Sequence, residues 1–294
     1  MAKGEARGGL AGMRPVLLYS KIRLHWGFIT RVPGASAAQP AYPLPPPTTV
    51  VGAYANPLAR LVGEPDSLYT GLAGGPPRGR RRPRLMPRIL KCSFEATLGA
   101  GAGLSGLVGV ASIEEPSRIL AGPYKGGGSY EKAVRSPPYI GVQEVMPVQA
   151  MGHAIAPGAM IEMAWLLDAD RLSACLGVGE EKLVGILELV AWSVYRVGSR
   201  EGLASVVDAR VYGEPRIGEG VFNSILYQRA DCATPEMGGT IEVTLNDIHY
   251  VEALYHVPAR GSVGALAPGD PVTFTTQPSC KYATVDGVGL AFRG

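Results

Sequence analysis

The stretch "QPAYPLPPPTTVVGAYA", residues 39–55, places a stiff segment directly before an ordered one. Five of the eight residues at positions 40–47 are proline. Proline fixes φ near −65° and suits the first turn of a helix, where its missing N–H is not needed. A helix from Thr48 to about Val62, which Pro57 should kink or split, is predicted by apolar residues at helical spacing, namely Val51, Ala55, Leu58 and Val62.

The start of this helix is expected to face an anion. The free N–H groups around Thr48 to Val50 should point the same way, with the positive end of the helix dipole behind them. Polyproline geometry would keep Gln39 to Pro45 extended. A proline-rich ligand for an SH3-type domain is the alternative, but the segment runs straight into a helix instead of standing free as a linker.

On the N-terminal side of this stretch lies "VLLYSKIRLHWGFI", residues 16–29, which opens with an apolar run and then alternates. A period of two predicts a strand with one buried and one cationic face. The expected buried face carries Ile22, Leu24 and Trp26, and the expected cationic face carries Lys21, Arg23 and His25.

On the C-terminal side further elements follow in order. A strand is predicted over residues 85–98, two more over 139–151 and 159–169 with a turn at Pro157–Gly158, a helix over 180–195 and a strand over 203–213. The rest should be all β, with turns at "EMGG", "PARG" and "APGD". This order fits an α+β, ferredoxin-like (RRM-like) core with a thumb-like β insertion and a C-terminal β extension, and not a doubly wound dehydrogenase.

The expected organisation has three parts. Residues 1–13 form a loose polar tail, residues 14–213 the RRM-like domain with its glycine- and arginine-rich insertions, and residues 214–294 a small β-rich domain. With 46% apolar and 18% charged residues, the chain should be folded. Neither a membrane span nor a signal peptide is recognisable, so a cytoplasmic protein is expected.

Four cysteines, Cys92, Cys175, Cys232 and Cys280, lie far apart without a CxxC pair. They are expected to be reduced, mostly buried thiols, and not a zinc site. Arginine far outnumbers lysine, while Asn and Gln are scarce, which hints at a thermophile.

Charge is divided unevenly along the chain. Residues 1–150 carry a net +10 and residues 151–294 a net −7, within a total of +3. A basic half beside an acidic half suggests a polyanion on one side and a protein on the other, or two halves that attract each other.

Enzymatic signatures are weak. "GAGLSG", residues 101–106, matches G-x-G-x-x-G, but the following residues look extended and not helical, so a glycine-rich connection or β-hairpin is favoured over a nucleotide site. No cofactor or metal is expected, because the histidines lack the spacing of a helical metal site and G-x-S-x-G is absent.

Basic segments instead favour a nucleic acid. The cluster "RGRRRPR" and the glycine-rich segment Lys125–Arg135 could meet phosphates, or could simply be solvated loops. "RVGSREG", residues 196–202, could cradle a phosphate, with Gly198 ending the preceding helix in a left-handed conformation, or form a plain turn. Stacking surfaces could come from Tyr42, Tyr124, Tyr130 and Trp26, although alternation places Trp26 in the core.

Two segments carry a family resemblance. Residues 25–59, with "PPPTT" opening a helix that carries "VVGA", resemble the N-terminal signature of the fifth CRISPR-associated (Cas) family of RAMP proteins, nearest to the archaeal subtype I-A branch. "WSVYRVGSREGLASVVDA", residues 192–209, is similar to a second landmark of that family. Together the two landmarks cover about fifty residues, and their order suits the whole chain.

The resemblance implies a non-catalytic subunit of the Cascade interference complex. Such a subunit caps the backbone, grips the 5′ handle of the crRNA, and contacts the backbone RAMP subunit and the large subunit. The expected RNA-binding residues are Lys21, Arg23, Arg31, Gln39, Tyr42, Thr48, Thr49, Arg80, Arg81, Arg82, Lys125, Arg196, Ser199 and Arg200.

An alternative comes from the subtype I-C branch, whose members cut precursor RNA without metal through Tyr, Lys and His side chains. A metal-independent endoribonuclease here would have to use His25, Tyr42 and Lys21, the nearby set that can be assembled. The Lys-His dipeptide associated with the cutting branch is absent, so the chain is not expected to be an enzyme.

Overall fold

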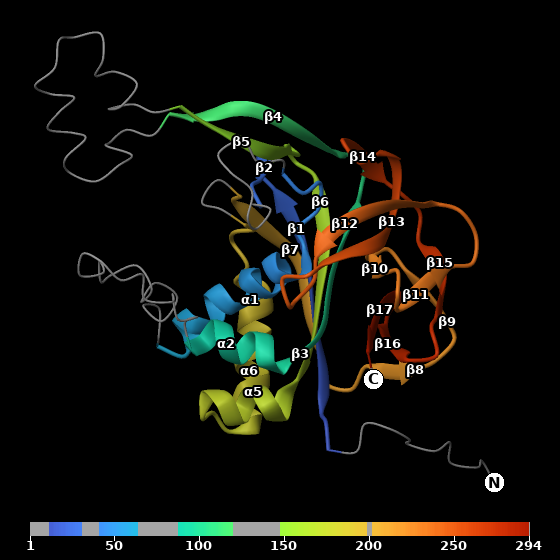
Figure 1. The fold of residues 1–294 in the computed structure, drawn as a ribbon. Helices are drawn as coiled ribbons and strands as arrows, with labels where there is room; N and C mark the ends of the chain where they lie inside the picture. The colour runs from blue at the N-terminus through green and yellow to red at the C-terminus, as the bar shows by residue number, and fades with distance from the viewer. Residues whose placement is uncertain (1–11, 31–40, 64–87, 120–147, 199–201, 294) are drawn as a thin grey trace, which may run out of the picture.

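The computed structural model describes residues 12–30, 41–63, 88–119, 148–198 and 202–293 (Figure 1). A four-stranded sheet forms its centre, with the strand order β3-β6-β1-β7 and every pair antiparallel. Its strands are β1 (Pro15–Leu24), β3 (Thr97–Ser105), β6 (Met160–Asp168) and β7 (Ala204–Tyr212). Counted along the chain, the second, third, first and fourth strands of this sheet lie side by side.

The helices lie together on one face of this sheet (Figure 1). They are α1 (Pro47–Leu61), α2 (Arg88–Ala96), α5 (Ala169–Leu176) and α6 (Glu180–Trp192). The predicted helix over 180–195 is confirmed, and Leu183, Leu187 and Val190 are its buried stripe. α5 was not predicted; Asp168 caps it by accepting hydrogen bonds from the N–H groups of Asp170 and Arg171.

Both faces of β1 are buried over its first half. Val16, Leu18, Ile22 and Leu24 pack into the core on the helical side. Leu17 and Tyr19 point the other way and pack with Leu290 and Phe292 of the C-terminal strands. The alternation predicted for the strand therefore holds up to Leu24, where β1 ends.

The proline-rich lead into α1 is a packed segment. Leu44 is fully buried, and the hydroxyl of Tyr227 donates to the carbonyl oxygen of Pro45 at 2.9 Å. The predicted helix is confirmed, starting one residue earlier at Pro47, and Pro57 does not split it. Burial of Leu44 and the hydrogen bond from Tyr227, a residue of the C-terminal half, therefore fix the direction in which the chain enters α1.

The strand predicted over residues 85–98 is wrong over most of its described length, because α2 occupies Arg88–Ala96. Ile89, Cys92, Ser93 and Ala96 are its buried residues, and their spacing of three and four is helical. Only from Thr97 onward does the chain become a strand.

The "GAGLSG" motif lies mostly in β3, and not in a flexible connection or a hairpin. A Cβ added at Gly103 would lie 2.1 Å from the carbonyl oxygen of Ile225, so the glycine permits close packing against the segment between β9 and β10. The extended segment expected after it is confirmed as β4 (Val110–Ile119).

A second, larger sheet has the order β10-β13-β14-β4-β5-β2, with β12 added beside β13. Its strands are β2 (Gly27–Phe28), β4, β5 (Val148–Ile155), β10 (Gln228–Arg229), β12 (Thr240–Asn246), β13 (Glu252–Ser262) and β14 (Ala265–Pro268). The predicted turn at Pro157–Gly158 joins β5 to β6. C-terminal strands therefore complete a sheet that begins in the N-terminal half, and the division after residue 213 stays a prediction.

Two three-stranded sheets finish the chain, in the orders β11-β15-β9 and β17-β16-β8. Their strands are β8 (Arg216–Gly218), β9 (Val221–Ser224), β11 (Ala233–Pro235), β15 (Val272–Thr276), β16 (Cys280–Val285) and β17 (Val288–Arg293). "EMGG" lies between strands as predicted, whereas the first two residues of "APGD" belong to β14 and only Gly269 and Asp270 lie between strands. "PARG" is instead part of β13, so that turn prediction is wrong.

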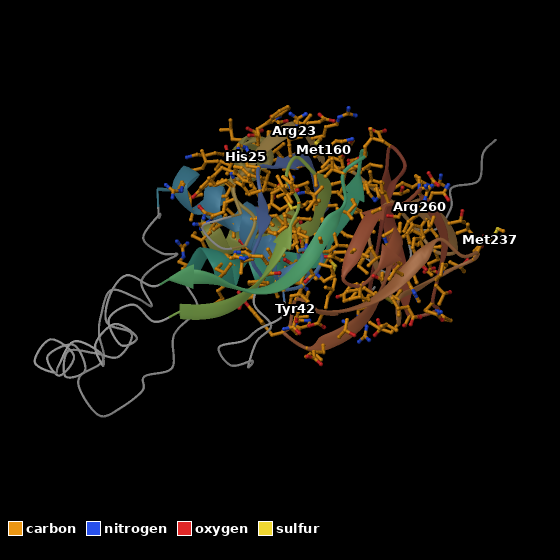
Figure 2. All side chains as sticks on the ribbon, turned by 90° about the horizontal axis from the view of Figure 1, so that it is seen from above. Arg23, His25, Tyr42, Met160, Met237 and Arg260 are labelled. Carbon is orange, nitrogen blue, oxygen red and sulfur yellow. A yellow bond between two sulfur atoms is a disulfide. The ribbon has the colours of Figure 1, made fainter. Side chains whose placement is uncertain are left out.

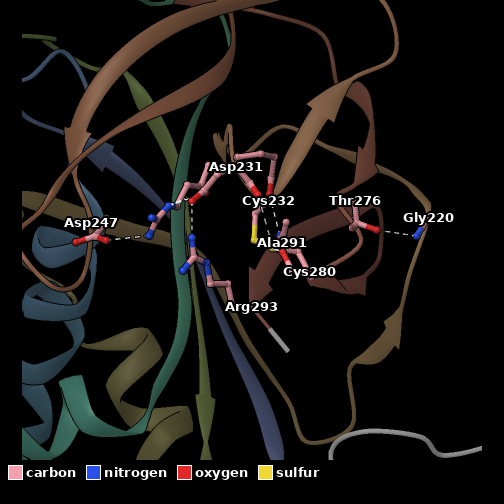
Figure 3. The surroundings of a disulfide bond; sticks show 11 residues. Gly220, Asp231, Cys232, Asp247, Thr276, Cys280, Ala291 and Arg293 are labelled. Carbon is pink, nitrogen blue, oxygen red and sulfur yellow. Dashed lines mark hydrogen bonds and ion pairs between the residues drawn. A yellow bond between two sulfur atoms is a disulfide. The ribbon is translucent and has the colours of Figure 1, made fainter.

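The four cysteines form two disulfides, which corrects the expectation of reduced thiols. Cys92–Cys175 joins α2 to α5, and Cys232–Cys280 lies among the C-terminal strands (Figure 3). Beside the second disulfide, Asp231 pairs with Arg229 at 2.7 Å and with Arg293 at 2.6 Å. Sequence spacing could not show these pairs because the partners meet only through the tertiary fold.

No helix in the described part of the chain combines the length and the apolar character that a membrane crossing requires. Within the same residues, no group of three His, Cys, Asp or Glu side chains is placed to hold a metal ion.

Candidate nucleic-acid interface

A shallow hollow of about 530 Å³ opens where β1 ends. Its lining residues are Arg23, Leu24, His25, Trp26, Gly158, Ser205 and Val207. We call it the Trp26 hollow. Figure 2 shows Arg23 and His25 near each other at one edge of the molecule.

The chain bends sharply here, which turns Trp26 outward. Gly27 has φ of +137°, and a Cβ at this position would lie 2.0 Å from the carbonyl oxygen of Ala154. The carbonyl oxygen of Trp26 accepts the N–H of Ala156 at 2.9 Å. The Trp26 side chain is left 75% exposed, so its predicted place on the buried face is wrong.

The hollow combines cationic and aromatic surface. Arg23 is exposed and makes no ion pair with any residue that the structure describes. The Nε2 atom of His25 lies 2.8 Å from the hydroxyl oxygen of Ser205, which fixes the imidazole beside Arg23. A phosphate could meet the guanidinium while an unpaired base stacks on the indole.

Lys21 lies on the same strand, but a carboxylate already neutralises it. Its Nζ is 3.3 Å from Oε1 of Glu162, a residue of β6 that is almost fully buried. Burial raises the pKa of the nearby Tyr19 hydroxyl, and the Glu162 carboxylate raises it further. The ammonium of Lys21 therefore offsets the cost of a buried negative charge, and a phosphate would have to compete with Glu162 for it.

The start of α1 offers fewer free donors than predicted. The N–H groups of Thr49 and Val50 both bond to the carbonyl oxygen of Pro46, at 2.8 and 3.1 Å. Of the three positions Thr48 to Val50, this leaves the N–H of Thr48 without a backbone partner among the described residues. Thr48 and Thr49 are half-buried.

Tyr42 is buried, so its ring offers no open face to a base in this structure. Its hydroxyl has no hydrogen-bond partner among the described residues. Burial raises its pKa, and the charge of Glu252 raises it further. Figure 2 shows Tyr42 well apart from Arg23 and His25.

The three residues considered for RNA cleavage are therefore not brought together. Lys21 is bound to Glu162, His25 contacts Ser205, and Tyr42 belongs to the core on the helical side of β1. A general base and acid must reach the same phosphodiester, which this arrangement does not provide.

Arg196 lies in the turn after α6, next to Tyr195, and pairs as an isolated bridge with Leu203. Gly198 has the predicted left-handed φ, +70°, but the helix ends earlier, at Trp192. A Cβ at Gly198 would lie 2.4 Å from the carbonyl oxygen of Ile29, so the glycine allows the turn to approach the segment after β2.

The remaining predicted contacts lie outside the described residues. These are Arg31, Gln39, Arg80, Arg81, Arg82, Lys125, Ser199 and Arg200. The Arg78–Arg84 cluster and the basic segment Lys125–Arg135 also lie there.

Sequence reasoning missed Ser205 and Val207 and misplaced Trp26. Ser205 and Val207 come from β7, and only the register of β7 against β1 brings Ser205 opposite Arg23. The signal for Trp26 was available, because a glycine directly after it can end a strand by adopting positive φ.

Known proteins match this chain both in sequence and in fold. No family model matches the chain. It is 26% identical over 200 residues to "CRISPR system aCascade subunit Cas5 1" of Saccharolobus solfataricus, covering 66% of this chain and 65% of that protein. The matched region thus covers slightly less than two thirds of that relative's length.

The fold is similar to the crystal structure of a CRISPR protein from Archaeoglobus fulgidus. The TM-score is 0.54 at 16% identity, over 95% of this chain and 99% of the other. At that identity the likeness shows the fold, a mixed α/β fold rich in strands. The sequence match agrees with the resemblance that the two landmarks carry, because the matched protein is a Cas5 subunit of a Cascade system.

Proposed function

We propose that this chain is a non-catalytic, crRNA-binding subunit of a CRISPR type I Cascade complex, where it caps the backbone and holds the 5′ handle. The observation that carries the proposal is the Trp26 hollow, where an exposed arginine without an ion pair among the described residues lies beside an exposed tryptophan. Arginine with an aromatic platform is the combination that single-stranded RNA recognition uses.

The sheet order adds support. A β3-β6-β1-β7 order with all pairs antiparallel is the arrangement expected of a ferredoxin-like (RRM-like) RAMP core. In such a core the helices cover one face of the sheet. Here the C-terminal strands cover part of the other face, and the Trp26 hollow lies at the end of β1. The proposed partners are the backbone RAMP subunit, the large subunit and the crRNA.

The test is binding of a labelled RNA with the sequence of the repeat-derived handle, followed by fluorescence anisotropy. Trp26→Ala should weaken binding about tenfold, because stacking on an aromatic ring contributes roughly 1–3 kcal/mol per base. Arg23→Ala should reduce the slope of log affinity against log salt by about one. Wild-type binding should also weaken steeply with salt.

Matched controls are available in the C-terminal part of the chain. Met237→Ala removes another highly exposed apolar side chain, and Arg216→Ala removes another exposed arginine that has no ion pair within the described residues. Neither should change binding. If the Trp26 and Arg23 variants bind as these controls do, or if affinity is flat between low and moderate salt, the proposal is wrong.

The endoribonuclease remains the second candidate and has its own test. Purified protein is incubated with repeat RNA in EDTA. Our proposal expects intact RNA. Clean cleavage that His25→Ala abolishes would instead support the enzyme.

A further inference from the structure

Beside the Trp26 hollow lies a second cationic group, which we call the Tyr195 sandwich and which consists of Arg60, Tyr195 and Arg196. The guanidinium carbons of Arg60 and Arg196 lie 5.7 and 5.8 Å from the centre of the Tyr195 ring. Both distances are within the range of a cation–π contact. Two cations thus share one aromatic ring.

Hydrogen bonds hold this group in place. The buried Asn56 side chain accepts from Nε of Arg60 at 3.2 Å and from the hydroxyl of Tyr195 at 3.4 Å. Nη2 of Arg60 also donates to the Tyr195 hydroxyl oxygen at 3.3 Å. A guanidinium has five N–H groups, so most of those on Arg60 remain available to a ligand.

No carboxylate balances these charges within the described part of the chain. Neither Arg60 nor Arg196 has an Asp or Glu within ion-pair distance there. Like charges near one ring repel each other, and an anion between or beside them would relieve that repulsion. Arg60 also lies in the last turn of α1, where the helix dipole favours a cation, so the dipole alone would explain one arginine but not the pair.

The sandwich is continuous with the Trp26 hollow through the backbone. The N–H of His25 donates to the carbonyl oxygen of Leu203 at 3.0 Å, and Leu203 pairs with Arg196. The N–H of Ala204 donates to the carbonyl oxygen of Tyr195 at 2.9 Å. Arg196 therefore lies about two strand spacings, roughly 10 Å, from His25, a distance that a few nucleotides can bridge.

We propose that the Tyr195 sandwich holds a backbone phosphate of the RNA strand whose base occupies the Trp26 hollow. Arg60 and Arg196 would contact the phosphate, while Tyr195 and Asn56 position the arginines. This inference rests on the proposed function, because it assigns a second contact to the same strand. It adds Arg60, Tyr195 and Asn56 to the residues that the sequence predicted.

The experiment measures anisotropy of a labelled single-stranded RNA over a salt series for Arg60→Ala, Arg60→Lys, Tyr195→Leu and the control Arg216→Ala. Arg60→Ala should weaken binding about tenfold and lower the salt slope by about one. Arg60→Lys should keep the slope but lose affinity, because lysine keeps the charge without the planar fork. Tyr195→Leu should weaken binding with little change in slope.

The double variant separates positioning from packing. If Tyr195 acts by holding Arg60, then Tyr195→Leu combined with Arg60→Ala should lose clearly less affinity than the product of the two single losses. Additive losses would contradict a positioning role for Tyr195. A cooperative thermal unfolding transition checks that each variant is folded. If Arg60→Ala does not fold, Arg60→Lys still tests the contact of Arg60 with RNA.

Several outcomes would overturn the proposal. If Arg60→Ala binds as Arg216→Ala does while Trp26→Ala and Arg23→Ala weaken binding, the sandwich is not a contact and the proposed function stands. If Arg60→Ala, Trp26→Ala and Arg23→Ala all bind normally, both proposals fail. Wild-type stabilisation by millimolar inorganic phosphate alone, lost in Arg60→Ala without any change in RNA affinity, would mean a free phosphate ligand. Polyglutamate and an unlabelled oligonucleotide can be compared as competitors of the labelled RNA at equal concentrations of negative charge. If polyglutamate displaces the RNA at the lower concentration, the partner of this group is an acidic protein.

Discussion

His256 makes stability depend on pH in a predictable direction. It lies in β13 beside Glu242, with Nδ1 3.9 Å from the carboxylate oxygen. Burial lowers its pKa below the ordinary value near 6.5, and the charge of Glu242 opposes this shift only in part. The unfolded chain therefore binds the proton more readily, and this contribution to stability, complete above about pH 6.5, is lost as the pH falls toward the folded pKa.

Thermal unfolding between pH 7.5 and 5 should therefore show a fall in Tm, and His256→Gln should make that fall smaller because glutamine does not titrate. His249→Gln is the matched control, since His249 is an exposed histidine just before the same strand. Equal pH profiles for wild type and His256→Gln would contradict the assignment.

Residue-scale prediction succeeded where one periodicity holds and failed where the chain changes direction. Ile22 and Leu24 are buried as alternation predicts, but the bend at Gly27 exposes Trp26. Lys21 is on the predicted face, yet its partner Glu162 comes from β6, and no local pattern reveals a cross-strand carboxylate. The charge pattern of the sequence therefore predicted the exposed, cationic Arg23, but it could not predict that Glu162 neutralises Lys21.

At the scale of elements, the Cys92–Cys175 disulfide should be a main anchor of the helical layer. It connects α2 to α5 across 83 residues. A crosslink that closes a loop of this length contributes roughly 4 kcal/mol in the chain-entropy treatment, and measured values are often smaller. Cys92→Ser with Cys175→Ser should lower Tm by several degrees under oxidising conditions.

Reductant provides the control for this prediction. It should lower the Tm of wild type further than that of the double serine variant, which retains only Cys232–Cys280. On oxidation the wild type should lose four free thiols, counted by a thiol reagent, and the double serine variant should lose two. Two free thiols that persist in oxidised wild type but not in the double variant would contradict the Cys92–Cys175 bond.

Elements with a single strong periodicity were predictable, and α2 was not. The buried residues of α6 keep a helical spacing, and β1 alternates between buried and more exposed side chains from Lys21 to Leu24. In contrast, α2 is short, and "ILKCSFEATL" passes without a loop from helix into β3. Apolar residues of β3 then extend the pattern, so the segment as a whole looks like a strand. The turn predicted at "PARG" was also wrong, because β13 accommodates Pro258 and Gly261 within the strand.

For the whole molecule, topology decides what no segment can show. The order of elements along the chain suggested the central sheet, but not that C-terminal strands would join β4 and β5 in a second sheet. Such pairings join residues more than a hundred positions apart, as with Ala265 and Ala111. Sequence-based domain boundaries depend on local composition, so they carry no information about sheets shared between distant segments.

This sharing leads to a prediction about the boundary at residue 213. A chain cut after Gly213 would expose Leu17, Tyr19 and Leu166, which now pack against Leu290 and Phe292. Each fully buried side chain of this size contributes about 1.5–3 kcal/mol on burial, so the loss would be comparable to the whole stability of an ordinary domain. Residues 1–213 alone should aggregate or bind a hydrophobic dye, and should lack a cooperative thermal transition.

Co-expression with residues 214–294 as a separate chain should restore both solubility and the transition, because the same surfaces would meet again. A soluble, cooperatively unfolding 1–213 fragment would instead show that the N-terminal part folds by itself, and that the C-terminal strands are an attachment and not a part of its core.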